Sequence, residues 1–346
     1  MAVHSKTAPD SARTVPSDSA SLETADASPA PEKATRRVRR AAVGTNKLPL
    51  PETVPPKRIL WPYAVSVGAY HLLALLAFWP WLFSWTGVAM ALAGLYLFGT
   101  LGINLCYHRL LTHRGFTCPL WLEHTLAVLG VCCLQDTPAR WVTIHRMHHQ
   151  YSDEQPDPHS PLVTFFWGHM GWIFVENREV NSIMNYDRYA RDILKDPFYF
   201  ALERNLLWFW INLAQATIFY LAGFAIGWAT TGQAMGGVQF GFSLVVWGVL
   251  LRTVLVWHIT WSVNSLAHIW GYQNYDTNEN SRNNWFVALV SNGEGWHNNH
   301  HADQRSAAHG HRWWEFDVTY LTVLTLEKLG LARDVVRPNA KLAAKS

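Results

Sequence analysis

Histidines recur at spacings suited to metal binding in four short segments of the chain, which read HRLLTH, HRMHH, NSLAH and HNNHH. On a helix, positions i, i+3 and i+4 lie on one face, so each His-x-x-His-His segment can present three imidazoles from one stripe. The two histidines of HRLLTH are five residues apart, which predicts that the helix ends or bends between them. The nine candidate ligands are His108, His113, His145, His148, His149, His268, His297, His300 and His301.

This donor set favours a pair of iron ions. It offers more nitrogens than one ion can hold, although imidazole alone suits iron, zinc, copper and nickel. No His-Glu-x-x-His zinc hydrolase motif occurs, and a structural zinc needs only four ligands. The Glu-x-x-His pattern of soluble di-iron proteins occurs once, from Glu294 to His297. A histidine-rich centre with two Fe²⁺ ions would activate dioxygen against an unactivated C–H bond.

The elements that must position these histidines are predicted to span a membrane. Only 15% of the residues are charged, 49% are hydrophobic, and 19 are Trp, which favours membrane interfaces. Residues 59–107 and 205–251 contain no Asp, Glu, Lys or Arg, and each run is long enough for two crossings. We therefore predict an all-α integral membrane protein with four transmembrane helices in two hairpins, at about residues 60–84, 87–107, 205–228 and 240–265.

The charges that flank these runs predict the orientation. The outer ends of the hairpins carry Arg58, Arg109, Arg114, Arg204 and Arg282, whereas the connecting turns carry no Lys or Arg. The positive-inside rule then places both termini and every histidine segment in the cytosol. The short apolar stretches 119–135 and 160–175 suit helices that lie in the membrane plane or dip into it.

The ends of the chain differ from this membrane region. Residues 1–55 are rich in Ser, Ala, Pro and Thr and contain a basic run, which predicts a disordered tail. The membrane domain is expected over residues 56–338, and residues 339–346 form a C-terminal tail. A formal charge of +3 gives no reason to expect nucleic acid binding, so the lipid bilayer is the expected macromolecular environment.

Other histidines have more ordinary interpretations. His71 and His258 stand alone in apolar helices, where core packing is favoured over ligation, although such a pair leaves a haem site open. The same packing role is expected for His124 and His169. A turn role is expected for His159 in DPHSP. Solvent exposure is expected for His4, His309 and His311.

The runs HRLLTHRGF, WVTIHRMHHQYSDEQPDPHSP, TWSVNSLAHIWGY and GEGWHNNHH resemble the membrane fatty acid desaturase family, most closely its Δ9 acyl-CoA and acyl-lipid branch. The resemblance covers about Trp61 to Arg337. It implies four membrane helices under a cytosolic cap, and two irons held by the nine histidines, with Asn264 reaching one iron through water. It also implies that a cis double bond forms at carbons 9 and 10 of a saturated acyl chain.

The resemblance further implies a kinked tunnel for that acyl chain. Tyr96 and Thr100 would line its closed end, although ordinary helix packing explains the tunnel residues nearly as well. Animal acyl-CoA desaturases typically have Arg and Asp before the second histidine box, where this chain has Thr143 and Ile144. This loss of charge favours an acyl-lipid substrate over acyl-CoA. The residues that would shape the kink are Gln135, Trp141, Thr260 and Trp261.

Desaturation needs electrons from outside the chain. We find no Gly-x-Gly-x-x-Gly dinucleotide motif after a strand and no His-Pro-Gly-Gly haem motif, so a separate donor is expected, a ferredoxin or a b-type cytochrome. Asp153, Asp157 and Glu294 are candidates for orienting ligand imidazoles. The candidate donor-docking residues are Arg178, Arg188, Arg191 and Lys195.

Two other functions remain open from the residues alone. The first is a membrane di-iron hydroxylase or ketolase acting on a lipid, because the same centre can return oxygen to the carbon radical. The second is a non-enzymatic haem or metal-binding membrane protein. Product analysis would separate the first from a desaturase, and a Soret band would reveal the second.

Overall fold

The computed structural model describes residues 47–55 and 58–339, which form helices joined by turns and loops. Residues 1–46 and 340–346, which hold most of the two expected tails, lie outside the described residues. The inner end of the first tail is described. The Leu48 N–H donates to the Leu162 carbonyl (3.1 Å), and Thr53 Oγ1 donates to Asn177 Oδ1 (2.9 Å). Residues 47–55 therefore run against the segment that contains Leu162 and Asn177.

Four helical segments are long and apolar enough to cross a membrane, as the sequence predicts. The first is α1 (Trp61–Ala74) with η1 (Leu75–Phe78), and the second is α2 (Trp85–Gly94) continued by the π-helical η2 (Leu95–Thr112). The third is α9 (Leu207–Thr231). The fourth runs through α10 (Ala234–Val245), η4 (Val246–Leu251), α11 (Arg252–Ser265) and η5 (Leu266–His268).

The first segment ends earlier than predicted because of a proline. Trp79 precedes Pro80 and adopts an extended backbone (φ −77°, ψ 122°), which the proline ring favours over the helical conformation. The helix therefore stops at Phe78 rather than near residue 84. Ser84 then caps the second segment, because its Oγ accepts a hydrogen bond from the Gly87 N–H (2.9 Å).

Helices α9 and α10 pack side by side through glycines. Gly232 ends α9 in the left-handed conformation (φ +69°), which glycine adopts without strain. A Cβ on Gly227 would lie 2.4 Å from the Gly236 carbonyl oxygen, and one on Gly223 would lie 2.8 Å from Gly241 Cα. The Gly-rich stretch thus belongs mostly to the helix, where it allows close backbone approach. For this reason the fourth span starts at Ala234 and not near residue 240.

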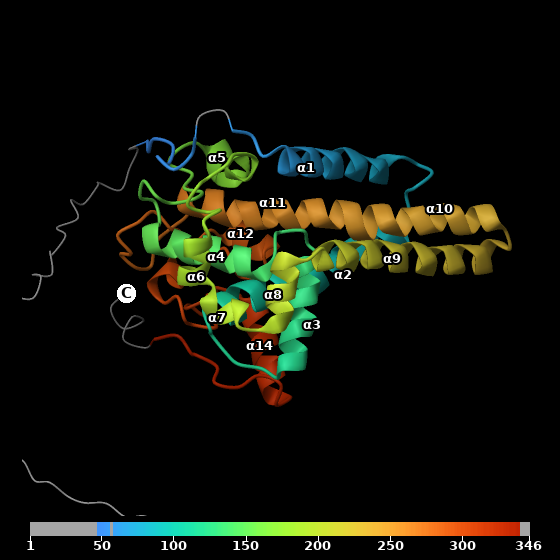
Figure 1. Cartoon of the computed structure of the whole chain (residues 1–346). Helices are drawn as coiled ribbons and strands as arrows, with labels where there is room; N and C mark the ends of the chain where they lie inside the picture. Colours follow the sequence, from blue (N-terminus) through green and yellow to red (C-terminus); the bar gives the residue numbers. More distant parts are fainter. Residues whose placement is uncertain (1–46, 56–57, 340–346) are drawn as a thin grey trace, which may run out of the picture. The chain divides into compact units, whose positions relative to one another are not determined.

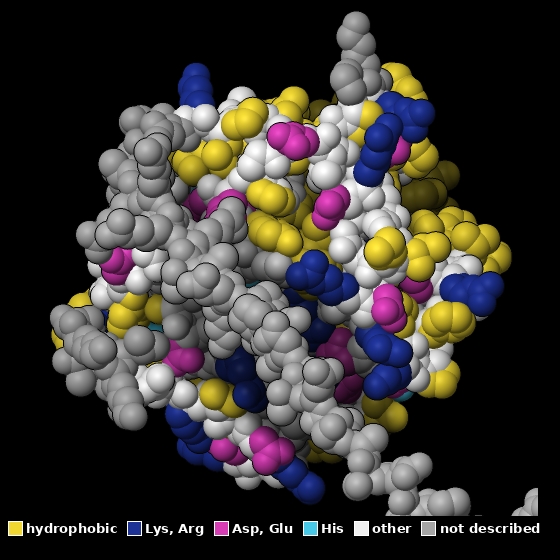
Figure 2. Space-filling view, turned by 60° about the vertical axis from the view of Figure 1, so that its left-hand side comes forward, with side chains coloured by type: hydrophobic (Ala, Val, Ile, Leu, Met, Phe, Trp, Pro, Cys, Tyr) yellow, Lys and Arg dark blue, Asp and Glu magenta, His cyan; other side chains and the backbone are white. Residues whose placement is uncertain are grey.

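Surface composition separates the long helices from the shorter ones. In Figure 1, α4, α5 and α6 gather around one end of α11. Helices α9 and α10 extend away from that end. Figure 2 brings that gathered end forward and shows side chains of both charges on it. The outward face of α9 instead exposes large apolar side chains, as expected against lipid. They include Trp208, Phe209, Leu213, Ile218, Leu221, Ile226 and Trp228.

Shorter helices complete the structure. The apolar stretch 119–135 forms α3 (Leu120–Val131), which packs against η2, whereas 160–175 gives only α5 (Phe165–His169) and η3 (Gly171–Phe174). The single helix expected over 160–175 is wrong, because Met170 leaves the helical conformation (φ −148°). The remaining short helices are α4 (Pro138–Tyr151), α6 (Ile183–Tyr189), α7 (Arg191–Leu194), α8 (Pro197–Arg204), α12 (Trp285–Val290), α13 (His297–Ala302) and α14 (Val318–Lys328).

Candidate metal centre

Two candidate ligands come from the end of η2. His108 lies within this segment, and His113 follows its last residue, Thr112. The His113 N–H donates to the His108 carbonyl (3.2 Å), and such an i→i+5 bond fits five residues into little more than one turn. The helix ends between the two histidines, as predicted. It is the wide π winding, however, that brings their ring centroids within 4.9 Å of each other.

Three ligands come from α4, which begins with strong helix signals. Thr137 caps the helix by accepting a hydrogen bond from the Arg140 N–H (3.4 Å), and Pro138 occupies the first turn. The helix then runs without a break through its three histidines to Tyr151. Its histidines are His145, His148 and His149.

Three more ligands come from α13, which begins directly after a tight turn. Gly293 in this turn has a φ of +120°, and a Cβ there would lie 2.4 Å from Asp317 Oδ1. Only glycine fits this position, which explains the Gly-rich context of the last histidine box. The ninth histidine, His268, ends η5.

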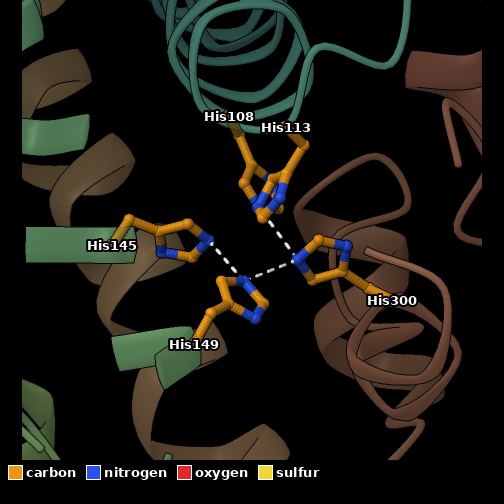
Figure 3. A group of neighbouring side chains, drawn as sticks. All are labelled: His108, His113, His145, His149 and His300. Carbon is orange, nitrogen blue, oxygen red and sulfur yellow. Dashed lines mark hydrogen bonds between the residues drawn. The ribbon is translucent and has the colours of Figure 1, made fainter. Parts of the chain in front are cut away.

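The nine histidines form two clusters, within each of which one ligand nitrogen per residue lies within 4.8 Å of every other. Figure 3 shows the first cluster, whose rings converge from η2, α4 and α13 on one point. It contains His108, His113, His145, His149 and His300. The second cluster contains His148, His268, His297 and His301. The clusters divide the histidines of α4 and of α13 between them.

The spacing within the first cluster suits metal ligands. The Nε2 atom of His149 lies 3.0 Å from that of His145 and 2.9 Å from that of His300 (Figure 3). An imidazole nitrogen has one site in the ring plane, either an N–H or a lone pair, so His149 Nε2 can form only one of these two contacts as a hydrogen bond. Two nitrogens that bind one ion at right angles, each about 2.1 Å from it, would lie about 3 Å apart. These rings therefore fit a shared cation better than a hydrogen-bond chain.

The second cluster has the same geometry. His297 Nε2 lies 3.0 Å from His268 Nε2 and 3.1 Å from His301 Nε2. His148 Nε2 is buried and has no hydrogen-bond partner among the described residues. A buried nitrogen without a partner is costly in an apolar interior, and a bound ion would remove that cost.

Carboxylates contact three of these rings at Nδ1, the nitrogen that faces away from the cluster, as proposed from the sequence. Asp157 accepts a hydrogen bond from His148 Nδ1 (3.0 Å), Asp153 accepts one from His268 Nδ1 (2.9 Å), and Glu294 accepts one from His108 Nδ1. The Nδ1 proton fixes the tautomer, so the Nε2 lone pair of each ring faces its cluster.

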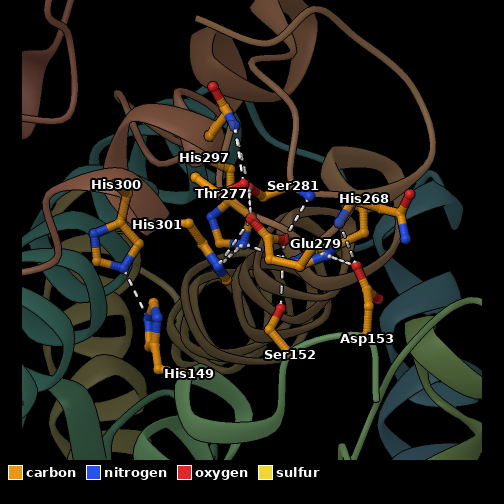
Figure 4. A network of polar contacts seen from close by, with 12 residues as sticks. His149, Ser152, Asp153, His268, Thr277, Glu279, Ser281, His297, His300 and His301 are labelled. Atoms are coloured by element: carbon orange, nitrogen blue, oxygen red, sulfur yellow. Dashed lines mark hydrogen bonds and ion pairs between the residues drawn. The ribbon is translucent and has the colours of Figure 1, made fainter. Parts of the chain in front are cut away.

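A fourth carboxylate, Glu279, was not anticipated. Figure 4 shows it between His268 and His301, with carboxylate oxygens 3.7 Å and 3.6 Å from their Nδ1 atoms. Ser281 N–H and Ser152 Oγ donate hydrogen bonds to Glu279 and orient it (2.6 and 3.4 Å). Glu279 lies in a polar loop outside every histidine box, so no spacing signal could have identified it.

A buried arginine supports Glu294. Arg109 donates to Glu294 Oε1 from Nε (3.0 Å) and Nη2 (2.7 Å), and it donates from Nη1 to Asp317 Oδ2 (2.9 Å). The Arg109 charge helps to hold the pKa of Glu294 well below its usual value of 4.5, despite the opposing effect of burial. Glu294 is therefore ionised and able to accept a hydrogen bond from His108 Nδ1.

Six of the ligand histidines outside the membrane spans are held neutral. Burial and neighbouring imidazoles lower their pKa values well below 6.5, because a charged ring would be desolvated next to other rings. Neutral rings keep the lone pair that binds a metal. These residues are His113, His145, His149, His297, His300 and His301.

Comparison with known proteins agrees with this geometry. Residues 81–320 match the family model described as "Fatty acid desaturase". The chain belongs to the fatty acid desaturase family. It is therefore an oxidoreductase of lipid metabolism. The desaturase is 41% identical over 290 residues to the sn-1 stearoyl-lipid 9-desaturase of Synechocystis sp., which covers 84% of each chain.

Other relatives of the desaturase are similarly close. It is 40% identical to the sn-2 palmitoyl-lipid 9-desaturase of Nostoc sp. (strain 36), over 83% of this chain and 93% of the relative. It is 43% identical to the chloroplastic palmitoyl-monogalactosyldiacylglycerol delta-7 desaturase of Arabidopsis thaliana, over 79% of this chain and 68% of the relative. Relatives of equal similarity thus bear names with different double-bond positions.

One cavity of the desaturase adjoins the first cluster. His145 borders it, and its walls include five residues proposed from the sequence: Gln135, Trp141, Thr260, Trp261 and Asn264. Tyr96 and Thr100 lie elsewhere on η2: Tyr96 Oη hydrogen-bonds Thr322 Oγ1 (2.8 Å), and Thr100 Oγ1 accepts from Asn292 Nδ2 (2.8 Å).

Two further histidines of the desaturase lie against the clusters. His309 was expected to be exposed, which is wrong: it is 1% exposed, and its Nδ1 lies 3.3 Å from Glu294 Oε2. Burial lowers the pKa of His309 to about 4. The backbone N–H of His159 donates to Asp157 (3.0 Å) in a turn, as expected, and its ring stacks on His148 at 4.4 Å.

The other histidines have local partners. His311 was also expected to be exposed, but it is partly buried and its Nδ1 hydrogen-bonds Tyr275 Oη (3.0 Å). His124 pairs with Asp196 (2.8 Å). His4 lies outside the described residues.

His71 and His258, which lie in two of the candidate membrane spans, form a hydrogen-bonded line with His169 of α5. His71 Nε2 lies 3.0 Å from His258 Nε2, and His258 Nδ1 lies 3.0 Å from His169 Nε2. A haem iron between His71 and His258 would hold these nitrogens about 4 Å apart, twice a typical metal–imidazole bond. The direct contact supports the packing role expected for these residues and argues against a haem between them.

Proposed function

We propose that the desaturase introduces a cis double bond between carbons 9 and 10 of a saturated acyl chain carried by a membrane lipid. In this reaction one –CH₂–CH₂– unit, O₂, two electrons and two protons give one –CH=CH– unit and two water molecules. The observation that carries the proposal is the division of nine histidines into two clusters, one of which borders a cavity lined by four of the six proposed tunnel residues.

Two Fe²⁺ ions would be held by the first and second clusters respectively, with Asn264 reaching one ion through water. When bound, they would supply the capacity to reduce dioxygen and to take hydrogen from unactivated methylenes. The protein contributes orientation: Asp157, Asp153 and Glu294 keep the Nδ1 protons of their histidines directed away from the clusters.

The cavity would position the acyl chain. Trp141 stacks on His145 with ring centroids 4.9 Å apart, so the wall that the acyl chain would touch is packed directly on a ligand. Gln135 Nε2 donates to Thr260 Oγ1 (3.0 Å), so these two polar side chains of the wall are paired with each other. Trp261 would complete the kink, and Tyr96 and Thr100 would bound the far end of the chain.

A lipid carrier is favoured by the charge at the outer end of this cavity. Tyr63 and Asp136 border both the cavity and a second hollow that continues from it past Arg140. Arg140 pairs with Asp136 (Nε–Oδ2 3.3 Å) and donates to Asn181 Oδ1 (2.9 Å). The charges of Arg140 and Asp136 thus compensate each other, which suits a weakly charged headgroup better than the phosphates of coenzyme A.

Further proposals follow from the predicted topology. The four spans would form two hairpins, with the short helices as a cap that carries the histidines on the cytosolic side and with both termini cytosolic. Residues 56–338 would form the membrane desaturase domain. Two electrons would come from a separate ferredoxin or b-type cytochrome.

Expression in a host without a Δ9 desaturase tests the proposal. We expect lipids with a double bond between carbons 9 and 10, located by mass spectrometry of dimethyl disulfide adducts. His148→Ala should abolish the product. His124→Ala, whose histidine pairs with Asp196 outside both clusters, should retain it. Saturated lipids from cells that contain the wild-type protein and a donor, or a hydroxylated product, would refute the proposal.

A further inference from the structure

A third hollow, separate from the two described above, borders the first cluster. His113 and His149 border it, and its rim carries Arg114, Arg146 and Arg305. We name this hollow the arginine depression. It shares no lining residue with the cavity that His145 borders. The first cluster is therefore approached from one side by a largely apolar cavity and from another by a basic depression.

His149 connects the arginine depression to the cluster. It is partly exposed, whereas the other four members of the cluster are buried. Its Nε2 atom lies within 3.0 Å of those of His145 and His300, while its ring borders the depression. Its Nδ1 atom has no hydrogen-bond partner among the described residues. The His149 imidazole thus connects the wall of the arginine depression with the ligand atoms of the cluster.

The charges of the depression are fixed in place and do not cancel. Arg146 donates to the carbonyls of Leu111 (2.9 Å) and Thr112 (2.9 Å), and it pairs with Asp192 (2.8 Å). Arg114 pairs with the same carboxylate (2.8 Å). These two arginines hold the pKa of Asp192 at about 2 against the opposing effect of burial, so one carboxylate faces two guanidinium groups. Arg305 adds a third positive charge to the rim.

We propose that a small acidic one-electron carrier protein docks on the arginine depression and reduces the centre through His149. This inference rests on the proposed desaturase function, which requires two electrons per double bond, delivered in two one-electron steps. Complementary charge would steer the carrier to the depression, and salt would weaken the complex. The carrier loses one electron in each step and leaves in its oxidised form.

The basic residues proposed for docking from the sequence do not line the arginine depression, although Arg188 contacts Gln150, which does. Arg191 pairs with Asp187 (3.5 Å), and both side chains are more than 70% exposed. Arg188 donates to Gln150 (3.3 Å). Neither arginine borders the arginine depression. Arg191 therefore provides a matched control for a charge change on the rim.

Binding of an oxidised, acidic plant-type ferredoxin to the immobilised, detergent-solubilised desaturase is the first test. Gln304 and Arg305 are exposed rim residues, so the double variant Q304E/R305E should fold normally. We expect it to bind the ferredoxin about tenfold more weakly at low salt, with a smaller difference at high salt. Arg191→Glu should bind as the wild type does. An acidic b-type cytochrome in a parallel arm shows which carrier binds more tightly.

Kinetics provide the second test. With the carrier as reductant, Q304E/R305E should show a raised KM for the carrier and an unchanged kcat. A single turnover after anaerobic reduction by dithionite should match the wild type. Unchanged carrier binding in Q304E/R305E, or an equal loss in Arg191→Glu, would overturn the docking proposal. Failure of the wild type to desaturate after chemical reduction would instead refute the proposed function and leave the binding result interpretable.

Discussion

His145 and His149 lie one turn apart on α4 with their Nε2 atoms 3.0 Å apart, yet their rings border different hollows of the protein. His145 borders the cavity proposed for the acyl chain, and His149 borders the arginine depression. One helical turn thus separates the side proposed for the substrate from the side proposed for the electron donor. This arrangement would let both approach the same centre without competing for space.

Removing a carboxylate behind a ligand should weaken iron binding. In the wild type, His148 Nδ1 donates to Asp157 Oδ2 (3.0 Å). In Asp157→Asn, the amide has the same shape but lacks the negative charge that strengthens this hydrogen bond. We expect iron affinity to fall about 10–100-fold, because such partners fix the orientation and basicity of the ligand. Iron per chain after dialysis against a graded chelator measures this. Asp187→Asn, at an exposed ion pair, is the control, and equal iron retention in both variants would contradict the assigned role of Asp157.

The hydrogen bond in the cavity wall should influence where the double bond forms. Thr260→Val keeps the side-chain shape but leaves Gln135 Nε2 without its acceptor (3.0 Å). Loss of about 1 kcal/mol should lower the yield of the main product about fivefold or move part of the product to neighbouring carbons. Double-bond localisation measures both effects. Thr217→Val, on the exposed face of α9, should give the wild-type product pattern.

Close backbone contact between η2 and α3 should limit the stability of the fold. A Cβ on Gly102 would lie 2.4 Å from the Gly130 backbone nitrogen, which cannot move without displacing α3. We expect Gly102→Ala to destabilise the protein by about 1–3 kcal/mol, visible as a lower melting temperature in detergent. Gly68→Ala on α1 meets no atom within 4 Å and should be neutral or stabilising. The same melting temperature for both variants would be inconsistent with this packing.

Acid should destabilise the metal-free protein. Burial and neighbouring rings lower the pKa values of His145, His149, His297, His300 and His301 well below 6.5 in the folded state. Below pH 6.5 the unfolded chain therefore binds protons that the folded chain does not bind. Stability should be highest above pH 6.5 and fall as the pH decreases, by up to about 1.4 kcal/mol per histidine and pH unit.

Thermal unfolding after chelation, followed between pH 7.5 and 5.5, measures this dependence. A variant with His300→Asn should show a shallower pH dependence, because one fewer proton is taken up on unfolding. A melting temperature that stays constant over this range would show that the rings are not held neutral.

Much of the architecture followed from local sequence. Uncharged apolar runs can satisfy their backbone groups in lipid only as helices, so the four spans were predictable from hydropathy. Their ends were less so. Pro80 shortened the first span. Glycines such as Gly236, whose sequence context suggests a loop, are packing positions between α9 and α10.

The ligand types and spacings were likewise visible in the sequence, and helical geometry explains part of their partition. Residues i and i+4 point almost the same way, so His145 and His149 share one cluster and His297 and His301 share the other. His148 and His300 each diverge from their helix neighbours and join the opposite cluster. Which cluster each joins depends on how α4 faces α13, and that relation has no local signature.

Sequence alone therefore determined the chemistry on offer, because residue type and helical period are local properties. Tertiary structure decided which side chains meet: it buried His309 against Glu294, placed Glu279 behind His268 and His301, and opened separate hollows beside His145 and His149. Contacts between segments far apart in the chain depend on the packing of whole helices, which no short stretch of sequence encodes.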